Sequence, residues 1–71
     1  MKVEDIVRVL GRGYVVVTTP ETEIHVGDIV TIDGTEFTVR GVEGMRHIKS
    51  VGLVLAPNTE VGNKKVGDEI N

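Results

Sequence analysis

The sequence predicts an all-β protein, built as a small barrel of six short antiparallel strands that is closed or nearly closed. Runs rich in Val, Ile and Thr recur along the 71 residues, and Gly, Pro, Asn or Asp separate most of them. No stretch repeats apolar residues with the 3.6-residue period of a surface helix. We therefore expect a single domain, residues 1–71, which at this length buries about 60% of its unfolded surface.

The first strand is expected at residues 3–10. Val7 and Val9 alternate there with Arg8, so that the two valines are predicted to face inward and Arg8 outward. Gly11-Arg12-Gly13 follows as a turn, because glycine adopts positive φ without a steric penalty.

The next two strands are expected at residues 14–19 and 29–32. Pro20 ends the earlier one because proline cannot donate to the ladder, and residues 21–26 cross over to the later one. Asp33-Gly34 then lies between two β-branched runs. This pair predicts a two-residue hairpin, so the third and fourth strands should be antiparallel neighbours.

In the fourth strand the alternation of apolar and polar residues is interrupted. Phe37 and Val39 lie on one face, but Gly41 is followed by the apolar Val42, which has the wrong parity for that face. One inserted residue would restore the parity, and glycine in a strand often accompanies such a β-bulge. The bulge would re-aim the side chains that follow it, including Glu43.

The C-terminal part is expected to contain two more strands. Val51–Ala56 is apolar at every position except Gly52, with Val51, Leu53 and Leu55 predicted to fill the barrel and Gly52, Val54 and Ala56 to face outward. Residues 58–65 are expected to form a polar loop, and residues 66–70 a short closing strand.

The tripeptide Val-Gly-Asp occurs twice, at residues 26–28 and at residues 66–68. A duplicated ligand site is one interpretation. A repeated turn is the other, in which Gly supplies backbone freedom and Asp caps backbone donors. We favour the repeated turn because its chemistry needs no ligand.

Charge and composition restrict the function. Eleven acidic and eight basic residues give a net charge of −3, which counts against a general electrostatic binder of nucleic acid but leaves a local site open. Tyr14 and Phe37 are the only aromatic residues, so a platform that stacks several bases is excluded. The absence of Cys, of a leader-like segment and of a long apolar run predicts a soluble cytoplasmic protein that does not enter a membrane.

Enzymatic activity is not expected. His25 and His47 lack partners at nucleophile or metal-ligand spacing, and a zinc site needs about three or four protein ligands. Ser50 has no base beside it in the sequence, so acyl transfer has no support. We predict no catalytic residues, no metal and no cofactor.

Five stretches in order resemble domain two of elongation factor Tu and related translational GTPases. They are Val-Glu-Asp-Ile-Val-Arg-Val-Leu-Gly-Arg-Gly-Tyr-Val-Val (3–16), Val-Gly-Asp-Ile-Val (26–30), Gly-Val-Glu-Gly-Met-Arg (41–46), Val-Gly-Leu-Val-Leu (51–55) and Val-Gly-Asp-Glu-Ile (66–70). The resemblance covers nearly the whole chain. It implies the translation-protein β-barrel, with six antiparallel strands in a Greek-key arrangement.

The resemblance also implies a binding site for RNA. The family's counterparts of Glu43 and Arg46 line the pocket for the terminal adenosine of aminoacyl-tRNA, and the loop matching Gly11-Arg12-Gly13 approaches ribosomal RNA. A carboxylate accepts hydrogen bonds from ribose hydroxyls, and a guanidinium pairs with phosphate or lies on a base. The densest basic cluster of the chain adjoins this stretch and consists of Arg40, Arg46, His47 and Lys49.

The chain departs from the family pattern in several places. The segment before the fifth strand is cut to residues 47–50, the Asp33-Gly34 hairpin is tighter, and Gly44 stands where the family usually has Met. The GTPase domain is absent, and Gly62-Asn63-Lys64-Lys65 lacks the features of a phosphate-binding loop, so we expect no GTP binding. This chain would therefore supply half of the family's tRNA-end pocket.

Two functions have support in particular residues, and a third, that of a box H/ACA-type small barrel, stays open on grounds of fold alone. The first is a non-catalytic module that contacts tRNA or ribosomal RNA through Glu43, Arg46 and the Gly11-Arg12-Gly13 turn. The second is a protein-interaction or self-association module that uses the outward side of Val51–Ala56. Each has a simpler alternative: a surface ion pair worth about 0–1 kcal/mol for Glu43 and Arg46, and partial cover of the outward side by residues 58–65.

Overall fold

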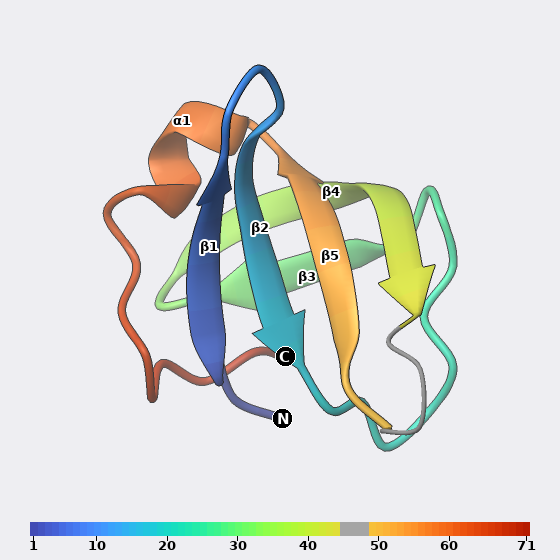
Figure 1. The fold of residues 1–71 in the computed structure, drawn as a ribbon. Coiled ribbons are helices and arrows are strands. Elements are labelled where there is room, and N and C mark those ends of the chain that lie inside the picture. The colour runs from blue at the N-terminus through green and yellow to red at the C-terminus, as the bar shows by residue number, and fades with distance from the viewer. Residues whose placement is uncertain (45–48) are drawn as a thin grey trace.

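A computed structural model describes residues 1–44 and 49–71, and within these ranges it contains one antiparallel sheet of five strands (Figure 1). In chain order the elements are β1 (Asp5–Val9), β2 (Gly13–Thr18), β3 (Ile29–Ile32), β4 (Thr35–Gly44), β5 (Val51–Ala56) and the short helix α1 (Asn58–Val61). The strand order is β1-β2-β5-β4-β3. The sheet curls, so that β1, β2 and β5 lie in front of β3 and β4. The all-β prediction is confirmed at this level.

The hairpin between β3 and β4 has the predicted turn. Ile32 pairs with Thr35, and Asp33 and Gly34 have φ values of 45° and 79°. Both central residues are thus left-handed, which is the conformation whose twist matches that of paired strands.

The predicted bulge in β4 is also present. Val39 pairs with Leu55, but the next paired residue is Gly41, opposite Val54, so Arg40 is the inserted residue. The insertion lets Val39 lie fully buried while Val42 also packs against the core. Without it, these two side chains would lie on opposite faces of the strand.

The predicted orientation of β1 is wrong. Ile6, not Val7, packs against the core, and it pairs with the fully buried Val16. Val7 pairs with Val15 on the other face and is 41% exposed. Residues 6 and 7 are both apolar, so the alternation could be read in either register, and pairing with β2 decides between them.

The polar loop expected at residues 58–65 begins instead with α1. This helix has four residues, too few to show an apolar periodicity in the sequence. Its last residue, Val61, is fully buried in the core. No helix in the described residues is long and apolar enough to cross a membrane.

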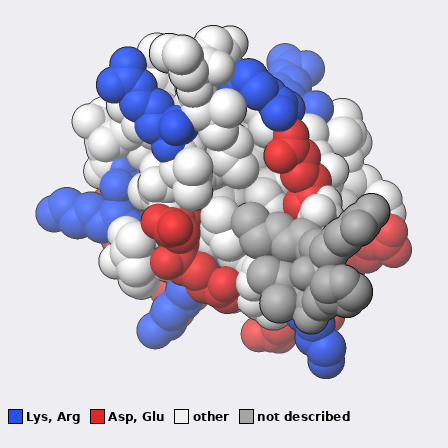
Figure 2. Space-filling model, in the orientation of Figure 1, with Lys and Arg blue, Asp and Glu red and all other residues white. Residues whose placement is uncertain are grey.

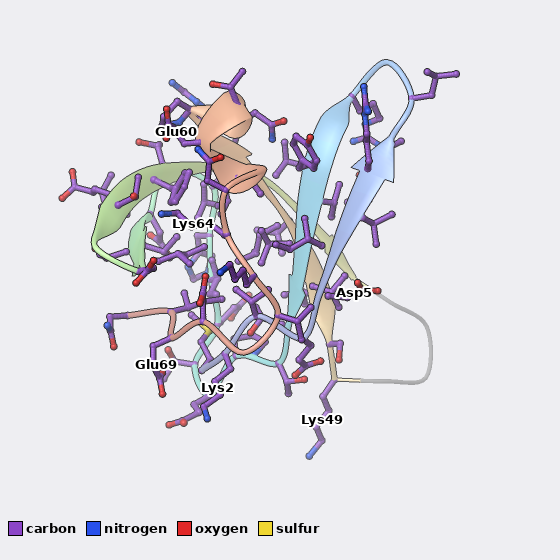
Figure 3. All side chains as sticks on the ribbon, turned by 90° about the vertical axis from the view of Figure 1, so that its left-hand side faces the viewer. Lys2, Asp5, Lys49, Glu60, Lys64 and Glu69 are labelled. Atoms are coloured by element: carbon purple, nitrogen blue, oxygen red, sulfur yellow. The ribbon has the colours of Figure 1, made fainter. Side chains whose placement is uncertain are left out.

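The closing strand expected at residues 66–70 is replaced by two isolated bridges, which join Lys2 to Glu69 and Ile32 to Ile70. Asn71 and Thr31 also exchange two backbone hydrogen bonds of 2.9 Å. The end of the chain therefore lies between its beginning and β3, and Figure 3 shows Lys2 and Glu69 close together.

The two Val-Gly-Asp segments form the same turn. Gly27 and Gly67 have φ values of 97° and 96°. The Asp28 side chain accepts from the backbone N–H of residue 25 at 2.9 Å, and the Asp68 side chain accepts from that of residue 65 at 2.8 Å. Each turn also exchanges two backbone hydrogen bonds with a buried valine, Val39 in one case and Val3 in the other. The repeated-turn interpretation accounts for both segments.

Candidate functional site

The candidate site lies on the outer face of the sheet, the side of β1, β2, β5 and β4 that is turned away from the core. Two rows of paired residues cross this face: Val7, Val15, Val54 and Gly41, and then Asp5, Val17, Gly52 and Glu43. Figure 2 views the molecule from this side. Basic side chains lie along its upper edge, near the turn between β1 and β2, and also at its lower margin, with acidic side chains among them.

Two predicted site residues meet on this face. The guanidinium of Arg12, in the turn between β1 and β2, donates from Nη2 to Oε1 of Glu43 at 2.6 Å. The residues are 31 positions apart, and their side chains are 57% and 48% exposed. The bond is short and charge-assisted, but an exposed ion pair of this kind adds only about 0–1 kcal/mol of stability.

The bulge explains why Glu43 reaches this face. After the inserted Arg40, Gly41 and Glu43 lie on the outer side, and Glu43 is paired with Gly52. A Cβ at Gly52 would lie 2.9 Å from Cγ1 of Val15. The glycine is therefore needed for Val15 to pack closely over β5, beside Glu43.

The position of Arg12 is set by a turn that is held at its base. The backbone N–H of Arg12 donates to the carbonyl of Val9 at 3.0 Å, and Gly11 and Gly13 have φ values of 79° and 88°. A Cβ at Gly13 would overlap Oδ1 of Asn58, so this glycine is also required by close packing.

Asn58 clamps the base of the turn with three hydrogen bonds. Its Oδ1 accepts from the backbone N–H of Tyr14 at 2.8 Å. Its Nδ2 donates to the carbonyls of Tyr14 and Leu55 at 2.9 and 3.1 Å. The first residue of α1 therefore ties β2 to β5 directly below the turn that carries Arg12.

The other predicted site residues are only partly placed. Gly11 is exposed in the turn, Arg40 is exposed at the bulge, and Lys49 is exposed just before β5 (Figure 3). Arg46 and His47 lie outside the described residues. The structure therefore brings Glu43 to Arg12, and the predicted pairing of Glu43 with Arg46 stays a prediction.

The outward side of β5 is less open than the pattern predicted. Leu53 and Leu55 are fully buried and Val51 packs against the core, as expected. Gly52, however, is buried, and the atoms nearest to it belong to Val15 and Glu43 rather than to residues 58–65. Val54 is half-buried.

Sequence reasoning missed a polar cluster near the start of β5. Ser50 Oγ donates to Oε1 of Glu4 at 3.0 Å and lies 3.0 Å from Oγ1 of Thr19. Ser50 thus does have a carboxylate beside it, but Glu4 is 46 residues away, so no local pattern could have indicated this. Hydrogen bonding to Thr19 is the main cause that lowers the pKa of Glu4 below its ordinary value of 4.5. A lowered pKa makes this carboxylate a weaker general base.

Sites for small ligands are poorly developed in the described residues. Among them no group of three or more His, Asp or Glu side chains is placed to hold a metal ion. A hollow of about 200 Å³ is lined by Met1, Glu21, Thr22 and Ile70, and none of these is a predicted site residue. Ligand pockets usually measure roughly 300–1,000 Å³.

Comparison of the chain with protein-family models, with curated proteins and with solved structures gives no match. The similarity to translational GTPases therefore remains a prediction from the sequence.

Proposed function

We propose that this chain is a non-catalytic RNA-binding module that contacts tRNA or ribosomal RNA through the outer face around Arg12 and Glu43. The main support for this proposal is the 2.6 Å contact between the side chains of Arg12 and Glu43. It joins the Gly-Arg-Gly turn and the bulged strand, the two stretches that the resemblance associates with RNA, into one exposed surface.

The proposal includes the translation-type barrel. The strands β1 and β3 are the outermost ones; Glu69 bridges to Lys2, which precedes β1, and Ile70 bridges to Ile32, the last residue of β3. In this barrel the sixth strand, expected at residues 66–70, would close the ring through its last residues, where these bridges lie. Closure of this kind protects the edges of a small sheet.

The chemistry of the outer face suits a polyanion that also carries hydroxyl groups. Arg12 offers a guanidinium group on this face, and the exposed Arg40 offers another at the bulge; guanidinium groups bind phosphate oxygens in a fork geometry. Glu43 offers a carboxylate, which accepts hydrogen bonds from ribose hydroxyls.

Titration of fluorescently labelled tRNA and of ribosomal small subunits with wild type, Arg12→Gln and Lys65→Gln tests the proposal. Lys65 is an exposed residue of the second Val-Gly-Asp turn, so its substitution removes the same charge elsewhere. Arg12→Gln removes one phosphate contact. It should weaken RNA binding and reduce the slope of log K against log[salt] by about one. Equal affinities of all three proteins for RNA would contradict the proposed site.

A protein-interaction module is the second candidate, and two exposed apolar side chains favour it. Leu10, at the turn between β1 and β2, is 99% exposed, and Val7 on the outer face is 41% exposed. Light scattering with wild type and Val7→Ser/Leu10→Ser tests self-association. A mass above 7.7 kDa that falls to the monomer in the variant would support this candidate, and a monomeric wild type would contradict self-association.

A further inference from the structure

The outer edge of β1 has no neighbouring strand in the described residues. β1 and β3 are the outermost strands, and on the β3 side Asn71 exchanges two backbone hydrogen bonds with Thr31. On the β1 side the corresponding contacts end at Val3, which exchanges two backbone hydrogen bonds with Gly67 and Asp68. The segment between α1 and Gly67 runs apart from β1 in Figures 1 and 3.

The backbone groups of Ile6 and Arg8 point to this open edge. In an antiparallel strand the N–H and C=O of one residue point to the same side, and successive residues alternate between the two sides. The carbonyl of Val9 accepts from the N–H of Arg12 across the hairpin, so the odd-numbered residues of β1 are bonded toward β2. The N–H of Ile6 donates instead to the exposed side chain of Asp5 at 2.8 Å. An edge of this kind is a template for another strand.

We propose that the open edge of β1 pairs with the same edge of a second copy of this chain, in antiparallel orientation and about a two-fold axis at Val7. The two sheets would then form one continuous sheet across the dimer. The inference rests on the second candidate function, self-association, to which it gives a defined interface, and it does not depend on RNA binding.

The register follows from the positions of the free backbone groups. With Val7 on the axis, each Ile6 lies opposite Arg8 of the other copy, and each such pair can exchange two backbone hydrogen bonds. With Ile6 on the axis, Val9 of one copy would meet Val3 of the other, whose edge is already occupied. With Arg8 on the axis, two guanidinium groups would lie opposite each other, and like charges in that position destabilise a strand pair.

The apolar row of the outer face is continuous in this register. The row consists of Gly41, Val54, Val15 and Val7, and Val7 at its end is 41% exposed. The two copies of Val7 would lie opposite each other at a non-hydrogen-bonded position, where side chains on paired strands come closest. Dimerisation would therefore cover Val7 with an apolar partner.

The charged side chains of β1 are compatible with this register. Asp5 and Arg8 lie on opposite faces of the strand, because side chains alternate along it. Asp5 would lie opposite Val9 of the other copy and Arg8 opposite Ile6, so that no like charges meet. The N–H of Ile6 would exchange the carboxylate of Asp5 for the backbone carbonyl of Arg8.

Disulfide trapping tests the register. The chain contains no Cys, so Val7→Cys introduces a single thiol. Opposed Cβ atoms at this position would lie about 4.5–5.5 Å apart, which a small adjustment brings within reach of a disulfide. Air oxidation should link Val7→Cys into a dimer. The matched control is Val26→Cys, at a side chain that is 65% exposed in the first Val-Gly-Asp turn, and it should be linked at least about tenfold more slowly because its thiols meet only by collision.

Light scattering over a range of protein concentrations measures the dimer dissociation constant of wild type, Val7→Lys and Val26→Lys. Two lysines facing each other on the axis repel, so Val7→Lys should raise this constant about tenfold or more, and Val26→Lys should leave it unchanged. Thermal unfolding curves verify that all variants are folded.

Hydrogen exchange of the ¹⁵N-labelled wild type distinguishes edge pairing from contact between outer faces. The N–H of Arg8 points away from β2, so it should exchange about tenfold or more slowly in the dimer than in the dilute monomer. The N–H of Val7 is bonded toward β2 in both states and serves as the internal control.

The outcomes separate the inference from the proposed function. A wild type that stays monomeric at about 1 mM would overturn the dimer, and RNA binding by that monomer would leave the proposed function intact. A dimer in which Val7→Cys is linked no faster than Val26→Cys, with an unprotected Arg8 amide, would overturn edge pairing and leave self-association through another surface. A trapped Val7→Cys dimer, with no RNA binding by wild type, would support the inference and overturn the proposed function.

Discussion

At the scale of single residues, the side chains that organise this molecule act over long sequence separations. Asn58 bonds Tyr14 across 44 positions, and Arg12 bonds Glu43 across 31. The sequence indicated Arg12 and Glu43 separately, through a turn pattern and a parity break. Their contact was not predictable, because it depends on how β1 and β4 are arranged on either side of β2 and β5.

Asn58→Ala should destabilise the protein by about 2–3 kcal/mol, because it leaves the half-buried N–H and carbonyl of Tyr14 without their partner. Urea unfolding measures the loss. The matched control is Asn63→Ala, whose side chain is exposed and makes one long contact of 3.5 Å with Glu60. Its effect should stay within about 0.5 kcal/mol. Equal losses in the two variants would show that Asn58 is not a clamp.

The pKa of Glu4 predicts a pH dependence of stability. Because the folded state holds this pKa below 4.5, ionised Glu4 stabilises the fold above about that pH, and the contribution is lost as the pH falls through the lower folded value. Glu4→Gln should therefore flatten the decline in stability below pH 4.5. Chemical unfolding between pH 6 and pH 3 measures this, with Glu36→Gln as the control; parallel curves for wild type and Glu4→Gln would refute the assignment.

At the scale of elements, local signals predicted the strands well and the termini poorly. The Asp-Gly turn, the bulge and the bounds of β3 and β5 were correct, because each depends on the backbone preferences of neighbouring residues. The prediction of which side chains of β1 face the core was wrong, because Ile6 and Val7 are adjacent apolar residues and either one could face inward. Helix α1 was missed because its single turn depends on burial of Val61, which is a tertiary contact.

The corrected register of β1 makes a direct prediction about packing. Val39→Ala should cost on the order of 1–3 kcal/mol, through lost burial and a cavity. Val7→Ala removes the same atoms from a side chain that is 41% exposed, so it should cost well under half as much. Urea denaturation compares the two directly. If Val7→Ala lowered the free energy of unfolding more than Val39→Ala does, Val7 would have to face the core, as the sequence pattern predicted.

The two Val-Gly-Asp turns should be energetically equivalent. Asp28→Ala and Asp68→Ala each remove one acceptor for a backbone N–H, with nearly equal distances of 2.9 and 2.8 Å, so each should cost about 1 kcal/mol. Thermal and urea unfolding of the two variants checks this. A loss confined to one of them would mean that the turns differ in role, despite their common geometry.

At the scale of the whole molecule, the fold brings the two chain ends together at one place and the candidate site to another. The terminal bridges join residues 2 and 69 and residues 32 and 70, whereas Arg12, Gly52 and Glu43 lie on the outer face of the central strands. The sequence predicted the class of fold from its strand pattern. The bridge between Lys2 and Glu69 joins residues 67 positions apart, and no local pattern in the sequence encodes such a pairing.

The central claim is that RNA binds the outer face around Arg12 and Glu43. Amide chemical shifts of the ¹⁵N-labelled protein, recorded during titration with a single-stranded RNA that ends in a free ribose, test it most directly. The account predicts that the largest changes cluster at Arg12, Gly13, Gly41, Glu43 and Gly52, which surround the ion pair. Changes concentrated at the two Val-Gly-Asp turns, or no changes at saturating RNA, would contradict it.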